Sequence, residues 1–179
     1  MRQALKLHPD SRCDAAIHVE VTRPRLGVLA LRYGVTGKTN GLVLPPIAAP
    51  TRTDELWRHT CFEAFVRPAP GEAYYEFNFS PSTQWAAYRF GGTRTGMSIA
   101  REIDAPRVDV HPNVAGFEMQ VLLELPSLPN DGPWRLGLSA VIEEAGGRKS
   151  YWALAHPPGK PDFHHSDCFA LELPAALGP

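Results

Sequence analysis

The feature that most constrains the fold of this chain is an alternation of apolar and polar residues with a period of two. Tyr75, Phe77 and Phe79 are separated by Glu76 and Asn78, a spacing that matches the alternating side chains of a β-strand. The same pattern, or a short apolar run, recurs at 17–21, 26–35, 61–67, 84–90, 107–110, 117–123, 134–142, 151–155 and 168–173. Together these segments predict about ten strands.

The residues between the apolar segments favour an antiparallel arrangement. The 18 prolines and 15 glycines fall mainly between the expected strands, where turns require them. Only 54–58 and 96–101 are helical candidates, and strands do not alternate with helices as in a parallel sheet. We therefore predict an all-β fold, a two-sheet antiparallel β-sandwich of jelly-roll type with minimal helix.

Composition excludes several classes of protein. The 179 residues suffice for one domain with a sizeable core. A net charge of -1 and dispersed basic residues argue against a nucleic-acid partner, and the sequence has no apolar stretch typical of a signal peptide or a membrane span. Cys13, Cys61 and Cys168 show no CxxC spacing, so neither a disulfide framework nor a zinc knuckle is expected. We therefore expect a cytoplasmic protein without a membrane or nucleic-acid partner, and the oligomeric state stays open.

Alternation also assigns faces to the strands. If Tyr75, Phe77 and Phe79 point into the core, Glu76 and Asn78 point outward. The segment 84–90 follows after a short connection, and we expect it to form a hairpin with the strand before it. In this segment Ala86, Tyr88 and Phe90 can face inward while Trp85, Ala87 and Arg89 face outward.

These assignments predict one outer surface that carries Glu76, Asn78, Trp85 and Arg89, with Glu63 of the strand 61–67 beside them. An exposed indole next to carboxylate, carboxamide and guanidinium groups suits a sugar, because the ring stacks on the C–H face while the polar groups bond to hydroxyl pairs. The alternatives are ordinary: Trp85 could cover a sheet or a dimer contact, and the carboxylates could pair with nearby arginines.

A second group of candidates lies in the loop before the last strand. Prolines in 157–161 stiffen this loop, which then displays Phe163, His164 and His165, and binding residues often occupy such loops. Consecutive residues on an extended backbone point in opposite directions, so His164 and His165 cannot easily hold one metal ion together. A metal set with further His or Asp residues and a purely structural imidazole hydrogen bond both stay open.

Three blocks of the sequence resemble a known superfamily. They are DELWRHTCFEAFV at 54–66, YYEFNFSPSTQWAAYRF at 74–90 and YWALAHPPGKPDFHH at 151–165. Together they resemble the DOMON-like superfamily, and within it a small bacterial branch similar to family-nine carbohydrate-binding modules. The resemblance covers about residues 15–174 and implies a β-sandwich that holds a sugar or a haem across one sheet and its end loops.

The resemblance also implies roles for single residues. In the sugar-binding modules a tryptophan precedes an acidic strand residue by six positions, and Trp57 and Glu63 keep this spacing. A late loop supplies the second stacking residue there, and here that loop carries Phe163, His164 and His165 instead of a tryptophan. The haem-binding relatives use Met and His ligands, so Met97 is a candidate, although methionine more often fills gaps in a core.

The sequence therefore favours a module that binds a small ligand, a carbohydrate or sugar derivative. Trp57 and Trp85 would stack on the ligand, and Phe163, His164 and His165 would close the site. Glu63, Glu76, Asn78 and Arg89 would hydrogen-bond to it. A module that binds haem or a divalent metal and an enzyme acting on a sugar remain as alternatives. Catalysis has less support, because the sequence has no nucleophile elbow, phosphate-binding loop or HExxH motif, and no cofactor is required on the favoured interpretation.

Overall fold

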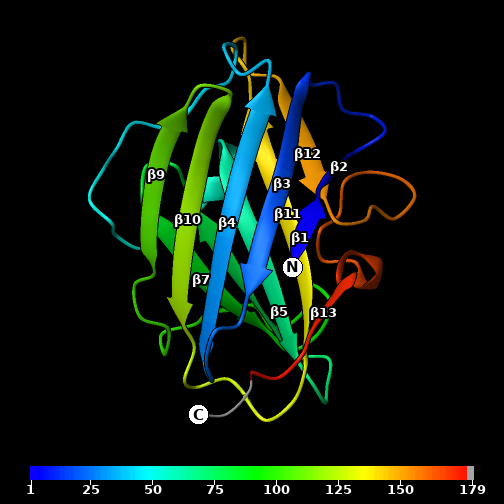
Figure 1. Cartoon of the computed structure of the whole chain (residues 1–179). Coiled ribbons are helices and arrows are strands. Elements are labelled where there is room, and N and C mark those ends of the chain that lie inside the picture. Colours follow the sequence, from blue (N-terminus) through cyan, green and yellow to red (C-terminus); the bar gives the residue numbers. More distant parts are fainter. Residues whose placement is uncertain (177–179) are drawn as a thin grey trace.

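A computed structural model describes residues 1–176 and confirms the all-β sandwich (Figure 1). Strands form nearly all of its regular structure, joined by two short 3₁₀ helices, η1 (Leu56–Arg58) and η2 (Ser166–Cys168). The strands are β1 (Arg2–Ala4), β2 (Lys6–Leu7), β3 (Ala15–Thr22), β4 (Val28–Gly37), β5 (Cys61–Pro68), β6 (Tyr74–Phe79), β7 (Trp85–Phe90), β8 (Ser98–Ile99), β9 (Arg107–Asn113), β10 (Gly116–Glu124), β11 (Trp134–Glu143), β12 (Lys149–Ala153) and β13 (Leu171–Leu173).

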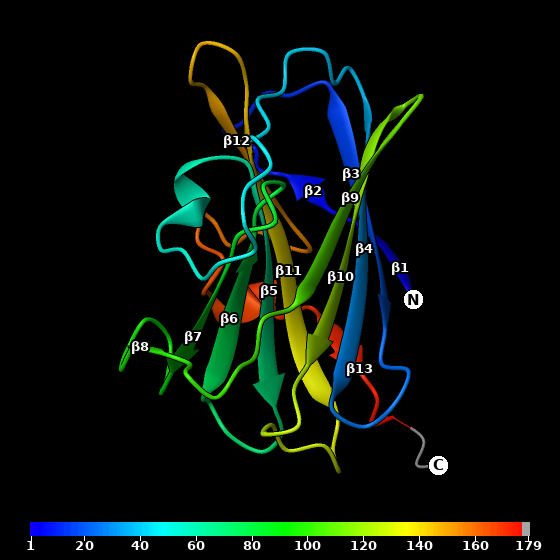
Figure 2. The ribbon, with the colours of Figure 1, turned by 90° about the vertical axis from the view of Figure 1, so that its left-hand side faces the viewer.

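The strands form two sheets with antiparallel neighbours. The first sheet has the order β1-β3-β4-β10-β9, and the second has the order β2-β12-β11-β5-β6-β7-β8, with β13 paired to one end of β11. Figure 2 shows the two sheets as separate layers. The η1 turn lies on the side of the second sheet that faces away from the first.

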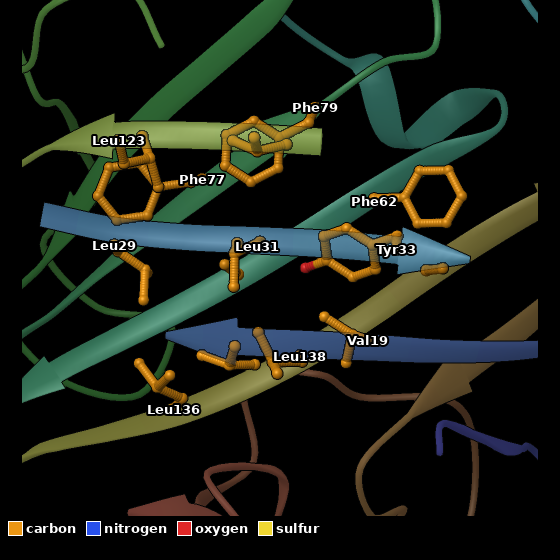
Figure 3. Close-up of a cluster of buried hydrophobic side chains, with 14 of the residues drawn as sticks. Val19, Leu29, Leu31, Tyr33, Phe62, Phe77, Phe79, Leu123, Leu136 and Leu138 are labelled. Atoms are coloured by element: carbon orange, nitrogen blue, oxygen red, sulfur yellow. The ribbon is translucent and has the colours of Figure 1, made fainter. Parts of the chain in front are cut away.

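The core lies between the two layers (Figure 3). Apolar side chains of β3, β4 and β10 meet those of β5, β6, β7 and β11, which is why the alternating residues of these strands are needed. Tyr33 is the polar exception on the first sheet. Its hydroxyl donates to the Glu63 carbonyl oxygen of the second sheet at 2.9 Å, so its polar end is satisfied inside the core.

The predicted orientation of β7 was wrong. Its register places Trp85 opposite Phe79 and Ala87 opposite Phe77, so Trp85 points into the core between the sheets and is only 5% exposed. The Arg52 guanidinium lies 4.2 Å above the ring centroid and closes the edge of the core there. Alternation did not decide the orientation because both faces of β7 carry buried aromatic residues and only Arg89, near the end of the strand, is exposed.

The outer face of the second sheet is itself largely buried. Side chains of β5, β6 and β7 that point away from the first sheet form a second apolar cluster, to which η1 and the segment after β12 contribute. The cluster consists of Leu56, Cys61, Phe65, Tyr74, Ala86, Tyr88, Phe90 and Phe169, with Phe163 packed against it. Tyr88 and Phe90 were predicted to face the core between the sheets. They are buried instead on the outer face of the second sheet.

Two smaller expectations also change. The stretch 96–101 contains the short strand β8 and not a helix, and the last apolar segment begins as η2 before β13. The structure has more strands than expected because β1, β2 and β8 have only two or three residues each, too few for an alternation to be recognised.

Candidate functional site

Two carboxylates and a carboxamide lie together on the outer face of β5 and β6. Glu63 of β5 pairs with Asn78 of β6, and Glu76 lies two residues before Asn78 on the same face of β6. Asn78 Nδ2 donates to Glu76 Oε1 at 2.7 Å, and Ser139 Oγ of β11 donates to Glu63 Oε2 at 3.0 Å. Glu63 is 3% exposed and Glu76 6% exposed, so the structure fixes both carboxyl groups inside the protein.

Burial changes the protonation of this carboxyl pair. Loss of solvent and the nearby charge of Glu76 together raise the pKa of Glu63 to about 8, against the opposing effect of the hydrogen bond from Ser139. Burial also raises the pKa of Glu76, against the hydrogen bond from Asn78. No Lys or Arg within residues 1–176 forms a salt bridge with either group. The pair therefore retains a proton near neutral pH, which lets it both donate and accept hydrogen bonds.

His164 reaches the same place from the loop after β12. Its Nδ1 lies 2.7 Å from the Tyr74 hydroxyl, and its Nε2 lies 3.5 Å from Glu76 Oε2. Burial and the positive charge of Arg94 lower the pKa of this imidazole to about 4, although Asp162 opposes the shift. His164 is therefore neutral at physiological pH, as a partner for uncharged polar groups requires.

A salt bridge connects the two loops at this end of the sheet. Arg94 follows β7, and its Nη2 atom lies 2.7 Å from Asp162 Oδ1 in the loop after β12. The same carboxylate oxygen accepts the backbone N–H of His164 at 3.1 Å, and the backbone N–H of Arg94 donates to the Tyr74 hydroxyl oxygen at 3.2 Å. These bonds hold His164 in place over the carboxyl pair.

The carboxyl pair and His164 border a cleft of about 480 Å³, which we call the main cleft. Aromatic rings contribute to its lining from two separate segments. Trp57 of η1 is 36% exposed and packs edge-on against Tyr88, with ring centroids 6.0 Å apart. Phe163 and Tyr151 line the cleft from the loop after β12 and from β12, with centroids 6.3 Å apart. The cleft thus combines stacking surfaces with polar groups, as small-ligand sites commonly do.

The structure brings together most of the residues that the sequence singled out. Trp57, Glu63, Glu76, Phe163 and His164 all line the main cleft. Asn78 is fully buried next to them and acts through its hydrogen bond to Glu76.

Three predicted residues lie elsewhere. Trp85 belongs to the core between the sheets, and Arg89 lies on the same side of β7, 3.5 Å from the Glu102 carboxylate. Both were predicted beside Glu76, and this placement is wrong because β7 has the opposite orientation. His165 turns away from the cleft, and its Nδ1 accepts the backbone N–H of Asp167 at 3.2 Å as the cap of η2.

The sequence alone missed much of the lining. The additional residues are Arg58, Phe90, Arg94, Val141, Lys149, Tyr151 and Pro161, and Met97, which the sequence offered only as a candidate haem ligand, also lines the cleft. Tyr151 has a local signal, because it precedes Trp152, which is 4% exposed in the core, and alternation then places Tyr151 on the outer face. The turn that positions Arg94 has no comparable signal.

No three His, Cys, Asp or Glu side chains among residues 1–176 gather in a way that could hold a metal ion. Over the same range, no helix has the length and apolar character needed to cross a membrane.

Comparison with solved structures finds the same β-sandwich fold in other proteins. A candidate carbohydrate-binding protein from Bacteroides uniformis superposes with a TM-score of 0.64 at 15% identity, over 93% of this chain and 83% of that one. A family 9 carbohydrate-binding module from Caldicellulosiruptor kristjanssonii in complex with glucose gives a TM-score of 0.56 at 10% identity, over 95% and 81% of the chains. The cellotriose complex of such a module from the same organism gives 0.53 at 10% identity, over 99% and 80%.

No family model matches the sequence, and no curated protein is similar to it at a significant level. The relationship is therefore one of fold. The class that the structure defines is the two-sheet β-sandwich shared with these proteins.

Proposed function

We propose that this protein is a carbohydrate-binding module that holds a sugar in the main cleft. One observation carries the proposal: the cleft has buried, hydrogen-bonding carboxyl groups at its base and aromatic rings from two distant segments, Trp57 and Phe163, in its lining. A sugar presents apolar C–H faces and dense hydroxyl groups, and this lining complements both.

Each group has a distinct role on this proposal. Trp57 and Phe163 provide stacking surfaces, while Glu63, Glu76 and the neutral His164 exchange hydrogen bonds with hydroxyl groups. The carboxyl pair retains a proton near neutral pH, so it can both donate hydrogen bonds to the hydroxyl groups of a neutral sugar and accept hydrogen bonds from them. No cofactor is required for binding of this kind.

The similar structures support the same conclusion from another direction. Two of them are complexes of a carbohydrate-binding module with glucose or cellotriose. The identities of 10–15% limit that likeness to the fold, so the assignment of a sugar to this chain rests on the lining of its own cleft. Membership of the DOMON-like superfamily is part of the proposal and rests on the three sequence blocks at 54–66, 74–90 and 151–165.

Thermal-shift and calorimetric titration with neutral mono- and disaccharides test the proposal. We expect at least one sugar to stabilise the wild type, and we expect His164→Ala to weaken its binding by about tenfold or more, since Glu76 and Tyr74 lose a buried partner. His165→Ala is the matched control, because this neighbouring imidazole faces away from the cleft. A wild type that binds no sugar, or equal losses in the two variants, would contradict the proposal.

A further inference from the structure

Each carboxyl group at the base of the main cleft has one oxygen bonded to the protein and one that is free. Glu63 Oε2 accepts the Ser139 hydroxyl, and Glu76 Oε1 accepts the Asn78 amide. Glu63 Oε1 and Glu76 Oε2 have no hydrogen-bond partner among residues 1–176, and neither oxygen is sealed from solvent. Because both residues line the main cleft, the two free oxygens face a ligand that lies there.

The free oxygens are also where the pair holds its proton. In a protonated carboxyl group the carbonyl oxygen is the better hydrogen-bond acceptor, so the oxygen bonded to Ser139 is the carbonyl oxygen and the proton lies on Glu63 Oε1. Glu63 and Glu76 are diagonal neighbours on β5 and β6, close enough for long side chains to meet. The base of the cleft thus presents one transferable proton beside one carboxylate oxygen.

The surroundings of the two carboxyl groups differ. Among the described residues the Glu63 carboxyl group is bonded only to the Ser139 hydroxyl. Glu76 accepts the Asn78 amide and lies 3.5 Å from His164 Nε2, and the positive charge of Arg94 works against the rise in its pKa. The anionic form is therefore better stabilised at Glu76, which makes Glu63 the acid and Glu76 the base.

An acid beside a base matches the chemistry of a reducing sugar. The anomeric carbon of such a sugar bears both the ring oxygen and a hydroxyl group. Ring opening requires a proton on the ring oxygen and removal of the hydroxyl proton, and a positioned acid or base accelerates such a transfer by about 10²–10⁴-fold. Buried carboxyl groups with shifted pKa values in a cleft are typical of sites that transfer protons.

We propose that the main cleft catalyses mutarotation, the interconversion of the two anomers of a reducing sugar, with Glu63 as general acid and Glu76 as general base. The inference rests on the proposed function, because the sugar must first bind in this cleft.

The proton transfers balance without a further reactant. Glu63 Oε1 gives its proton to the ring oxygen as the bond between that oxygen and the anomeric carbon breaks. Glu76 Oε2 takes the proton of the anomeric hydroxyl group as the aldehyde C=O bond forms. Rotation about the adjacent C–C bond turns the other face of the aldehyde toward the ring hydroxyl, and ring closure reverses both transfers. The carboxyl pair ends with the one proton with which it began.

Polarimetry of the freshly dissolved α anomers of glucose, galactose and lactose tests the inference. We expect the wild type to accelerate the mutarotation of at least one of them about tenfold or more over buffer alone. Glu63→Gln should remove this increase, because glutamine has no acidic proton, although its amide oxygen still accepts the Ser139 hydroxyl. Glu124→Gln is the matched control and should keep the full increase, because Glu124 is an exposed carboxylate that pairs with Arg25.

Calorimetry with the same sugars separates catalysis from binding. The Glu63→Gln protein should bind the sugar within about tenfold of the wild-type affinity, since the substitution changes one hydrogen bond. A wild type that binds one of these sugars but leaves its mutarotation at the buffer rate would overturn the inference and leave the proposed function intact. A Glu63→Gln protein with the full increase would do the same. Binding of none of the sugars would overturn the inference together with the proposed function.

Discussion

The two faces of the second sheet are built from the same strands but have different roles. Its inner face carries Phe62, Phe77 and Leu138 against the first sheet, with apolar side chains on both sides of the contact. Its outer face combines an apolar cluster around Phe65 and Tyr74 with the buried polar groups Glu63, Glu76 and Asn78. Both faces exclude water, but only the outer one is bordered by a cleft.

The difference shows how one strand can serve stability and binding together. On β5 and β6 each apolar residue of the inner face is followed by a residue of the outer face, so the packed core holds the polar side chains in fixed positions. The outer face is covered by loops and not by a sheet, and loops leave room for a cleft where a sheet would fill it.

Two tryptophans illustrate the contrast. Trp85 lies on the inner side, 5% exposed, and Trp57 lies at the cleft, 36% exposed. We therefore expect removal of the Trp85 ring to lower stability and removal of the Trp57 ring to weaken ligand binding.

The largest effect is expected for Trp85→Ala. Truncation of a buried aromatic side chain leaves a cavity in the core and typically costs about 3–5 kcal/mol of unfolding free energy, and here the Arg52 guanidinium would also lose its aromatic partner. Urea denaturation measures the change. A loss below about 1 kcal/mol would show that Trp85 does not belong to the core and would reverse the comparison.

An intermediate effect is expected from the carboxyl pair as pH changes. The pKa of Glu63 is raised to about 8 from an ordinary value of 4.5, so the folded state holds a proton that the unfolded chain releases, and stability falls as pH rises toward 8. His164 acts in the opposite sense: its pKa is lowered to about 4 from 6.5, and its contribution is lost only as pH falls below 6.5. The interval from 6.5 to 8 therefore isolates the carboxyl pair.

Urea denaturation at pH 6.5 and at pH 8 should show a wild type less stable by about 1–2 kcal/mol at the higher pH. Glu63→Gln should reduce this difference, because glutamine does not titrate. Glu124→Gln, on an exposed carboxylate that pairs with Arg25 at the surface, should leave it unchanged. A wild type whose stability does not change across this interval would mean that Glu63 is ionised in the folded protein.

The smallest change in stability is expected for Trp57→Ala. This side chain is partly exposed and packs on Tyr88 at one edge, so its removal should cost no more than about 1 kcal/mol. The same variant should lose sugar binding, which calorimetry would detect. A strongly destabilised variant, or one that still binds sugar with wild-type affinity, would remove Trp57 from the cleft's stacking surface.

Much of the architecture was predictable because, in a strand with one apolar and one polar side, the sequence indicates which side faces the core. The alternation in β6 correctly placed Phe77 and Phe79 inside and Glu76 and Asn78 outside. Glu63 and Glu76 could be assigned to one surface for the same reason. The prediction failed for β7, where Trp85 and Tyr88 are both large and buried. Its one charged residue, Arg89, is exposed but lies on the same side as the buried Trp85, so it indicated the wrong face.

The sequence by itself determined the all-β class, the approximate positions of the long strands and the acidic residues that face outward, because these follow from local periodicity. Only the tertiary structure decided the register of β7, the direction in which His164 and His165 separate, and the cleft itself. Trp57 and Phe163 line that cleft from segments about a hundred residues apart in the chain. Such an arrangement depends on how the sheets pack and how loops cover them, and no local pattern of residues encodes it.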